Sequence, residues 1–276
     1  MIRTDIPVGL SLSGGGASID ILHLVVNGAI PRPEHFAVLF ANTKWENRWT
    51  YDEIDAAEEL CKKEGITFIR CGQEEGLPEH LIRGAREELS HADHPALFIK
   101  KDNGGIGRTM QKCTGEFKIA PMRRAQRVWL KSIGQPMRIM KWIGYTAEET
   151  TRIAKAISKR DVEYELLDFP LARLGKRRAH VHEDNIKYVG RKIRWSACRG
   201  CPANTLERLR EVVQHDPESL YEVDEATRDM SRAGIVEGDC YQNRHLMPIE
   251  TLIKKGPKQT SFDAFDVGCD GGHCFL

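Results

Sequence analysis

The sequence predicts an α/β protein built on a doubly wound, mostly parallel five-stranded sheet, followed by a small irregular C-terminal appendage. Short apolar runs alternate with helical patterns through about residue 170. Each connection between apolar runs is long enough to carry a helix, and such crossovers join parallel strands. After Pro202 the alternation stops. We therefore divide the chain into a domain at 1–205 and an appendage at 206–276 that carries a cysteine-containing tail.

The individual elements follow from local patterns. The first strand is an apolar run that ends at Ser13 and breaks into three glycines, where a helix begins. The segment 51–64 is rich in Glu, Ala and Leu, and 118–133 is amphipathic and basic, so both are expected to be helical. Strands are expected at about 7–13, 36–41, 65–70, 137–143 and 162–167, and helices at about 16–27, 51–64, 77–91, 118–133, 147–159 and 204–214.

Composition limits the class of protein. The chain has 276 residues, of which 41% are hydrophobic, which is enough for the core of one large domain. It has neither an apolar run of about 18 residues nor the long apolar core of a signal peptide. Its eight cysteines are too few for a disulfide-built secreted scaffold. We expect a cytoplasmic protein with no membrane partner.

The charge distribution is uneven. The net charge is only +1, yet residues 100–200 contain 24 lysines and arginines against ten acidic residues. A basic middle between acidic ends indicates an anion-binding face, with room for DNA or RNA beside a small anion. The alternative is that these cations simply solvate helix surfaces.

A glycine-rich loop is the most informative local feature. Ser13-Gly14-Gly15-Gly16-Ala17-Ser18 lies between the first strand and the first helix. Glycines let a backbone approach a phosphate closely, and the N–H groups and dipole of the following helix favour an anion. The alternative is a tight turn with no ligand. The loop matches neither the Walker pattern nor the dinucleotide-binding pattern.

Other motifs follow in a fixed order along the chain. They read Phe40-Ala41-Asn42-Thr43-x-x-Glu46, Cys113-Thr114-x-x-Phe117-Lys118, Ile143-Gly144-Tyr145-x-x-x-Glu149-x-x-Arg152, Phe169-Pro170-Leu171 and Cys198-x-x-Cys201-Pro202. Together with the glycine loop, they resemble the PAPS-reductase-like family, including its phage and mobile-element members. This family belongs to the adenine-nucleotide α-hydrolase (PP-loop ATP pyrophosphatase) superfamily. The resemblance covers roughly residues 6–205.

The resemblance implies an adenine nucleotide (ATP, PAPS or APS) as ligand and assigns residues to it. Lys118 falls inside a family motif and is the cation we expect to act on the substrate. Arg152 is expected to point at the substrate anion, although with Glu149 it could equally form a simple helix-surface pair. The expected nucleotide-binding residues are Ser11, Ser13, Gly14, Gly15, Gly16, Ser18, Asn42, Thr43, Glu46, Arg108, Gly144 and Arg152.

Two departures from the family pattern bear on the reaction. Pyrophosphatase members carry Asp where this chain has Ala17, and Asp where it has Asn42. Two carboxylates that could help to hold Mg²⁺ are therefore absent. This argues against cleavage of ATP between its α- and β-phosphates and leaves nucleotide binding intact.

The cysteines indicate metal, cluster or redox chemistry. Cys198-x-x-Cys201 can bind a metal from a single turn. By resemblance to APS reductases, Cys113 joins them around a [4Fe–4S] cluster, with a fourth ligand among Cys240, Cys269 and Cys274. Zinc at the same site is one alternative. Thiols buried as small hydrophobic side chains are the other.

The C-terminal tail carries a second pair of cysteines. Cys269-Asp-Gly-Gly-His-Cys274 loosely resembles the tail segment of sulfonucleotide reductases, in which a cysteine attacks the sulfur of the substrate. The resemblance makes Cys274 and Cys269 catalytic candidates that would need a thiol reductant. Alternatively, Cys269 is a cluster ligand, or the tail thiols are incidental.

Three functions follow from these patterns. The first is thiol- or cluster-dependent reduction of a sulfonucleotide. The second is nucleotide-activated sulfur transfer to nucleic acid, of the DNA phosphorothioation or tRNA thiolation type, with Mg²⁺ accompanying ATP. The third is a non-catalytic module that binds a nucleotide or nucleic acid. A homo-oligomer is expected, because relatives often self-associate.

Overall fold

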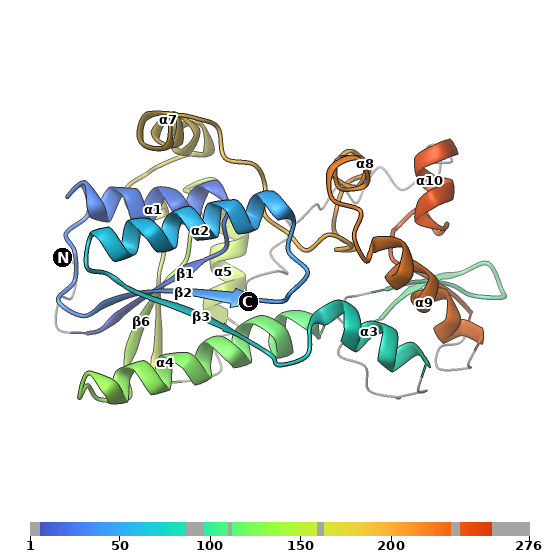
Figure 1. Ribbon diagram of the computed structural model, residues 1–276, viewed down its shortest axis with the longest axis horizontal. Helices are drawn as coiled ribbons and strands as arrows, with labels where there is room; N and C mark the ends of the chain where they lie inside the picture. Colours follow the sequence, from blue (N-terminus) through green and yellow to red (C-terminus); the bar gives the residue numbers. More distant parts are fainter. Residues whose placement is uncertain (1–5, 87–96, 110–111, 159–162, 233–237, 256–276) are drawn as a thin grey trace.

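A parallel five-stranded sheet forms the centre of the molecule, as predicted. The computed structural model describes residues 6–86, 97–109, 112–158, 163–232 and 238–255 (Figure 1). All four neighbouring pairs in the sheet are parallel. The strand order is β3 (Thr67–Gly72), β2 (Phe36–Asn42), β1 (Val8–Leu12), β6 (Ile139–Trp142) and β7 (Glu165–Asp168).

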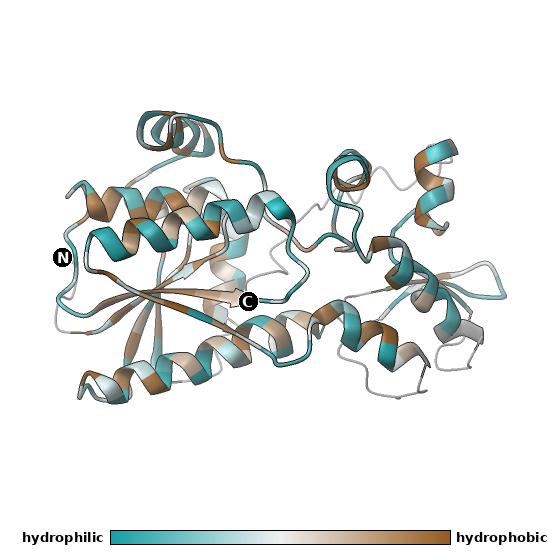
Figure 2. Ribbon diagram, in the orientation of Figure 1, coloured by the Kyte–Doolittle hydropathy of each residue, from teal (hydrophilic) through white to brown (hydrophobic). Residues whose placement is uncertain are grey.

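Helices cover both faces of this sheet, which explains why the inner strand β2 is apolar and buried from Phe36 to Ala41. Val38 and Phe40 of β2 pack into the core beneath α1 (Gly16–Val26), α2 (Arg48–Lys63) and α7 (Arg178–Val189). Ala37 and Leu39 point the other way, toward α4 (Ala120–Ser132). Figure 2 shows hydrophilic and hydrophobic residues side by side along the covering helices, as expected where one helical face is buried and the other is in water.

The strand order reverses at β1, which pairs with β2 on one side and with β6 on the other. The loops that leave the carboxyl ends of β1 and β6 therefore separate, and such a reversal is where open α/β sheets bind ligands. Gly144, just after β6, packs against the first turn of α1. A Cβ atom at Gly144 would lie 2.9 Å from the backbone N of Ser18, so only glycine allows this approach.

A second, smaller sheet lies beyond the main one and was not predicted. Its antiparallel order is β5 (Ile106–Arg108), β4 (Phe98–Lys100) and β8 (Asp239–Tyr241), next to the packed pair α3 (Leu77–Arg86) and α9 (Leu220–Arg232). The segment 101–105 is the turn of the β4–β5 hairpin. Strands of three residues are too short to give a period-2 signal.

Four further helices are described. They are α5 (Thr150–Ser158), α6 (Pro170–Arg173), α8 (Leu206–His215) and α10 (Ile249–Lys255). The segment after residue 205 is thus largely helical where it is described, rather than irregular. The tail with Cys269 and Cys274 lies outside the described residues. Within the described ranges, no helix has both the length and the apolar character needed to cross a membrane.

Candidate functional site

A cavity of about 680 Å³ opens at the carboxyl ends of the central strands. Its walls come from the loop after β1, the end of β2, the loop after β6, α7 and the segment 192–196. A π-helical turn, η1 (Gly115–Ile119), also reaches it through Lys118 and Ile119. Residues of four predicted motifs thus line one cavity where the strand order reverses, whereas Phe169-Pro170-Leu171 and the Cys198–Cys201 pair lie outside its lining.

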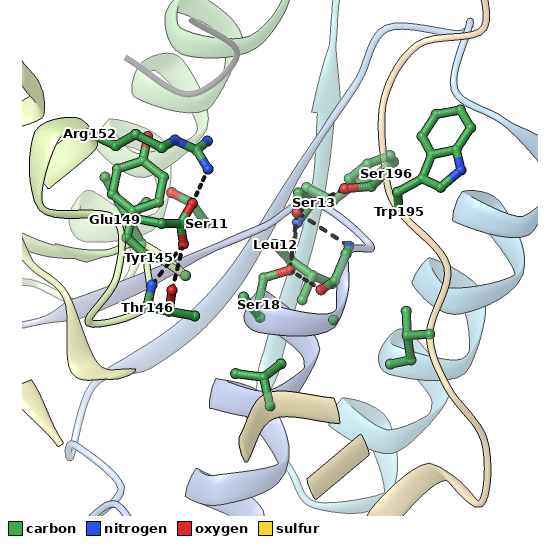
Figure 3. Close-up of a pocket in the computed structure, with 18 of the residues that line it drawn as sticks. Ser11, Leu12, Ser13, Ser18, Tyr145, Thr146, Glu149, Arg152, Trp195 and Ser196 are labelled. Carbon is green, nitrogen blue, oxygen red and sulfur yellow. Dashed lines mark hydrogen bonds and ion pairs between the residues drawn. The ribbon is translucent and has the colours of Figure 1, made fainter. Parts of the chain in front are cut away.

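The glycine loop is held by hydrogen bonds between its two serines (Figure 3). The Ser18 hydroxyl accepts from the backbone N–H of Ser13 at 3.1 Å and donates to the carbonyl of Gly15 at 3.0 Å. The two hydroxyl oxygens lie 3.2 Å apart. Ser11, Ser13, Gly15, Gly16 and Ser18, which the sequence predicts to bind the nucleotide, all line the cavity.

Helix α1 presents its N-terminus to this cavity. The helix begins after Gly15, which has an extended backbone and no side-chain cap, and the first turn carries no acidic residue. The leading N–H groups of a helix have no intrahelical acceptor, and the helix dipole adds partial positive charge there. Gly14 does not line the cavity, but its φ of +74° shapes the turn. The loop can therefore hold a phosphate or sulfate.

The segment before the Cys-x-x-Cys motif closes over this loop. The Ser196 hydroxyl donates to Ser13 Oγ at 3.3 Å. A Cβ atom at Gly15 would lie 2.7 Å from Ser196 Oγ, so the glycine allows the two segments to touch. Residues nearly two hundred positions apart thus lie side by side in the cavity wall.

The cavity is strongly cationic. Its lining includes seven lysines and arginines, Lys118, Lys141, Arg152, Arg178, Lys192, Arg194 and Arg208. The only two acids in that lining, Glu46 and Glu149, each pair with one of these cations. The excess positive charge favours a ligand with several negative charges.

Arg152 and Glu149 form an ion pair at the cavity wall. They form the expected pair one helical turn apart, yet both also line the cavity (Figure 3). Glu149 accepts from the backbone N–H and the hydroxyl of Thr146, at 2.8 and 3.1 Å. The Arg152 guanidinium lies over the Tyr145 ring, 4.4 Å from its centroid. These contacts fix the guanidinium at the cavity wall.

Glu46 connects the cavity to the cysteines. Its carboxylate lies 3.3 Å from Lys118 Nζ and accepts a hydrogen bond from Thr43 at 3.1 Å. The Cys198 thiol donates to the same oxygen at 3.6 Å. Thr43 is buried outside the cavity lining. Asn42 lies outside it too, and its side-chain oxygen accepts from the N–H of Lys44 and the Tyr51 hydroxyl.

The three predicted metal ligands Cys113, Cys198 and Cys201 pack in one cluster with Trp45 and Phe117. Burial and the nearby Glu46 carboxylate raise the pKa of the Cys198 thiol well above its usual range. Within the described residues, no group of three or more metal-binding side chains has the arrangement to hold a metal ion.

Two observations beside the Cys198–Cys201 turn are compatible with a bound group. The buried Trp45 Nε1 and the Gln242 amide have no hydrogen-bond partner in the described parts of the chain. Gly200 lies close to both groups: a Cβ atom added there would be 2.3 Å from the Trp45 ring and 3.2 Å from Gln242 Oε1. The cluster, zinc and buried-thiol interpretations all remain predictions.

Other residues differ from expectation in their location. Arg108 lies on β5 over the Phe98 ring, outside the cavity lining. Sequence reasoning did not single out Lys192, Arg194 or Arg208, which do line it. The basic run at 191–194, directly before Trp195, was the signal available for two of them. Their approach to the glycine loop depends on long-range contacts that local patterns do not contain.

Comparisons with known proteins find a likeness among solved structures. No protein-family model and no curated protein sequence match the chain. Among solved structures, the chain is similar to the U34-tRNA thiolase NcsA from Methanococcus maripaludis with its [4Fe–4S] cluster. The identity is 17%, the match covers 83% of this chain and 74% of the other, and the TM-score is 0.42. At that similarity, no ligand, activity or family passes from the neighbour to this chain.

Proposed function

We propose that the protein is an enzyme that binds an adenine nucleotide in this cavity and performs sulfur chemistry with it. The observation that carries the proposal is the Ser13–Ser18 loop at the N-terminus of α1, facing a cavity with seven cationic side chains. Phosphate and sulfate oxygens suit such donors. The apolar lining from Phe40, Ala41 and Met122 offers a surface for the base.

We infer that side-chain cations, rather than Mg²⁺, neutralise the ligand. Glu46 and Glu149, the acids of the lining, are each paired with a cation. The two positions where pyrophosphatase relatives carry Asp hold Ala17 and Asn42. A sulfonucleotide, PAPS or APS, fits these residues, because its reduction cleaves no bond between the α- and β-phosphates.

Reduction of a sulfonucleotide is the first reaction that we propose. A thiolate attacks the sulfur of the phosphosulfate, the bond from sulfur to the bridging oxygen breaks, and the nucleoside phosphate leaves. A second thiol then attacks the S-sulfonated cysteine, releases sulfite and leaves a disulfide, so two electrons pass from thiols to substrate. A dithiol reductant restores the enzyme. Cys269 and Cys274 are the proposed thiols, because Cys198 is buried.

Calorimetric titration tests nucleotide binding. We expect PAPS, APS and ATP to bind more tightly than GTP, with affinities that EDTA leaves unchanged. Lys118→Gln should weaken binding, whereas Lys131→Gln, an exposed residue of α4 outside the cavity lining, should not. No binding of any adenine nucleotide would overturn the proposal.

Product analysis tests the reaction. With PAPS or APS and a dithiol, we expect sulfite and a nucleoside phosphate in equal amounts, lost in Cys274→Ser and Cys269→Ser variants. Nucleotide binding without sulfite, pyrophosphate or AMP release would instead identify the non-catalytic module.

Sulfur transfer to nucleic acid is the second candidate. It is favoured by the number of cations at the cavity, which exceeds what one phosphosulfate needs. Incubation with ATP, a sulfur donor and tRNA or DNA should then give thiolated nucleic acid, detectable by mass spectrometry of the digested nucleosides. If the nucleic acid gains no sulfur while PAPS or APS gives sulfite, reduction of a sulfonucleotide is the reaction.

A further inference from the structure

Four cations form the outer end of the cavity and are here called the arginine wall: Arg178, Lys192, Arg194 and Arg208. They come from three consecutive pieces of chain: α7, the segment after it, and α8. Arg178, Lys192 and Arg194 are exposed and Arg208 is half-buried. The wall thus joins the cavity to the protein surface.

The wall supplies charge beyond what a nucleotide needs. The inner cavity already has Lys118, Lys141 and Arg152, together with the N–H groups of the glycine loop. The whole chain carries a net charge of only +1, so the concentration of cations here is local. A ligand that contacts both the inner cavity and the arginine wall must carry negative charges along its length, from the glycine loop to the protein surface.

Two tryptophans hold two of the wall's three arginines, Arg194 and Arg208, in place. The rings of Trp49 and Trp195 meet edge to face, with centroids 5.3 Å apart. The Arg194 guanidinium lies 5.3 Å from the Trp49 centroid, and the Arg208 guanidinium lies 5.1 Å from the Trp195 centroid. Planar guanidinium groups on aromatic faces are pre-organised for phosphate binding.

Hydrogen bonds fix the tryptophans in turn. Trp49 Nε1 donates to the carbonyl of Trp195 at 2.9 Å, and Trp195 Nε1 donates to Glu211 at 2.7 Å. Both rings are only half-buried, and Trp195 lines the cavity. The wall therefore combines phosphate-binding cations with aromatic and guanidinium planes, the pairing used to bind single-stranded nucleic acids.

We propose that a single-stranded nucleic acid binds along the arginine wall, with its phosphates on these four cations and one end directed into the nucleotide cavity. This inference rests on the proposed function, because strand and nucleotide share the cavity. The unstacked bases of a single strand can lie against the exposed parts of the tryptophan and guanidinium planes. The bases of a duplex are stacked on one another and cannot make this contact.

Fluorescence anisotropy with labelled 12-nucleotide strands of RNA and DNA, and with the matching duplexes, tests the proposal. We expect the single strands to bind and the duplexes to bind at least tenfold more weakly. The strand that binds more tightly, RNA or DNA, identifies which nucleic acid the wall prefers.

Charge reversal locates the surface. The double variant Arg194→Glu/Arg208→Glu should lose more than tenfold in strand affinity. Two phosphate contacts fewer should also reduce the slope of log Kd against log salt by about 1.4. The matched control is Lys131→Glu/Lys155→Glu, on the exposed sides of α4 and α5 with the same change in net charge, which should retain affinity.

A conservative variant guards against misfolding. Arg194→Lys/Arg208→Lys keeps both charges but loses the planar stacking, so it should keep the salt slope and lose part of the affinity. Absence of strand binding, equal binding of duplexes, or an equal loss in the control variant would each overturn the inference. Nucleotide titration of the same wild-type preparation separates this failure from failure of the proposed function.

Discussion

The carboxylate of Glu46 and the ammonium of Lys118 form a buried ion pair, 3.3 Å apart, at the boundary between the cavity and the cysteine cluster. The same carboxylate oxygen accepts from the Cys198 thiol at 3.6 Å. Glu46 therefore connects Lys118, which lines the cavity, to Cys198 in the cysteine cluster. Glu46 is 3% exposed, so neither charge of the pair is well solvated.

Replacing Lys118 by Met should destabilise the protein by about 3 kcal/mol, because it leaves the Glu46 charge buried without its cation. Urea unfolding measures this free energy. The double variant Glu46→Gln/Lys118→Met should recover much of the loss. Equal stability of the single and double variants would contradict the coupling.

Substitution of Gly144 by Ala should weaken adenine-nucleotide binding at least tenfold. The added Cβ would lie 2.9 Å from the backbone N of Ser18 and displace the first turn of α1. Gly107→Ala is the control, since a Cβ there makes only ordinary contacts, 3.5 Å and longer, on β5. Calorimetry on both variants is the measurement. Unchanged affinity in Gly144→Ala would show that the turn tolerates the shift.

Nucleotide affinity should rise as the pH falls from 7.5 to 6. Burial lowers the pKa of His182, which lines the cavity, and the nearby Lys192 and Arg178 lower it further. A bound polyanion favours the protonated form, so binding takes up a proton. Titration with APS in buffers of different ionisation enthalpy counts that proton. The His182→Gln variant should bind APS without taking up a proton. Proton uptake that persists in this variant would contradict the assignment to His182.

Asp20 should make stability fall as the pH rises. Burial raises the pKa of this carboxyl from 3.8 to about 6, despite Lys176 at 3.1 Å, which lowers it. Between these values the folded protein holds a proton that the unfolded chain has lost. From pH 4 to pH 7, the stability of the wild type should therefore fall by about 2 kcal/mol relative to Asp20→Asn. Urea unfolding at each pH gives the difference, and parallel curves would refute the assignment.

Metal analysis of anaerobically purified protein addresses the cysteines. The cluster predicted from Cys113, Cys198 and Cys201 requires about four irons and matching sulfide per chain, lost in Cys198→Ser. Zinc in place of iron would support the second interpretation. A metal-free protein would identify the three thiols as part of the hydrophobic cluster they share with Trp45 and Phe117.

Local patterns were sufficient for the main sheet and the glycine loop. Leu10, Phe40 and Trp142 lie in strands whose two faces are both buried, so these strands are largely apolar in sequence. Ser13–Ser18 carries its turn chemistry within six residues. The hairpin at 98–108 leaves no such apolar run. The contact between Trp49 and Trp195, which builds the outer wall, joins distant positions that no local window contains.

A structure determined with PAPS or ATP bound tests the central claim most directly. We predict that a phosphate or sulfate group lies within hydrogen-bond distance of the backbone N–H groups of Gly16 and Ala17, with Lys118 or Arg152 on its other side. A nucleotide bound elsewhere, or a glycine loop that stays empty at saturating ligand, would contradict the account.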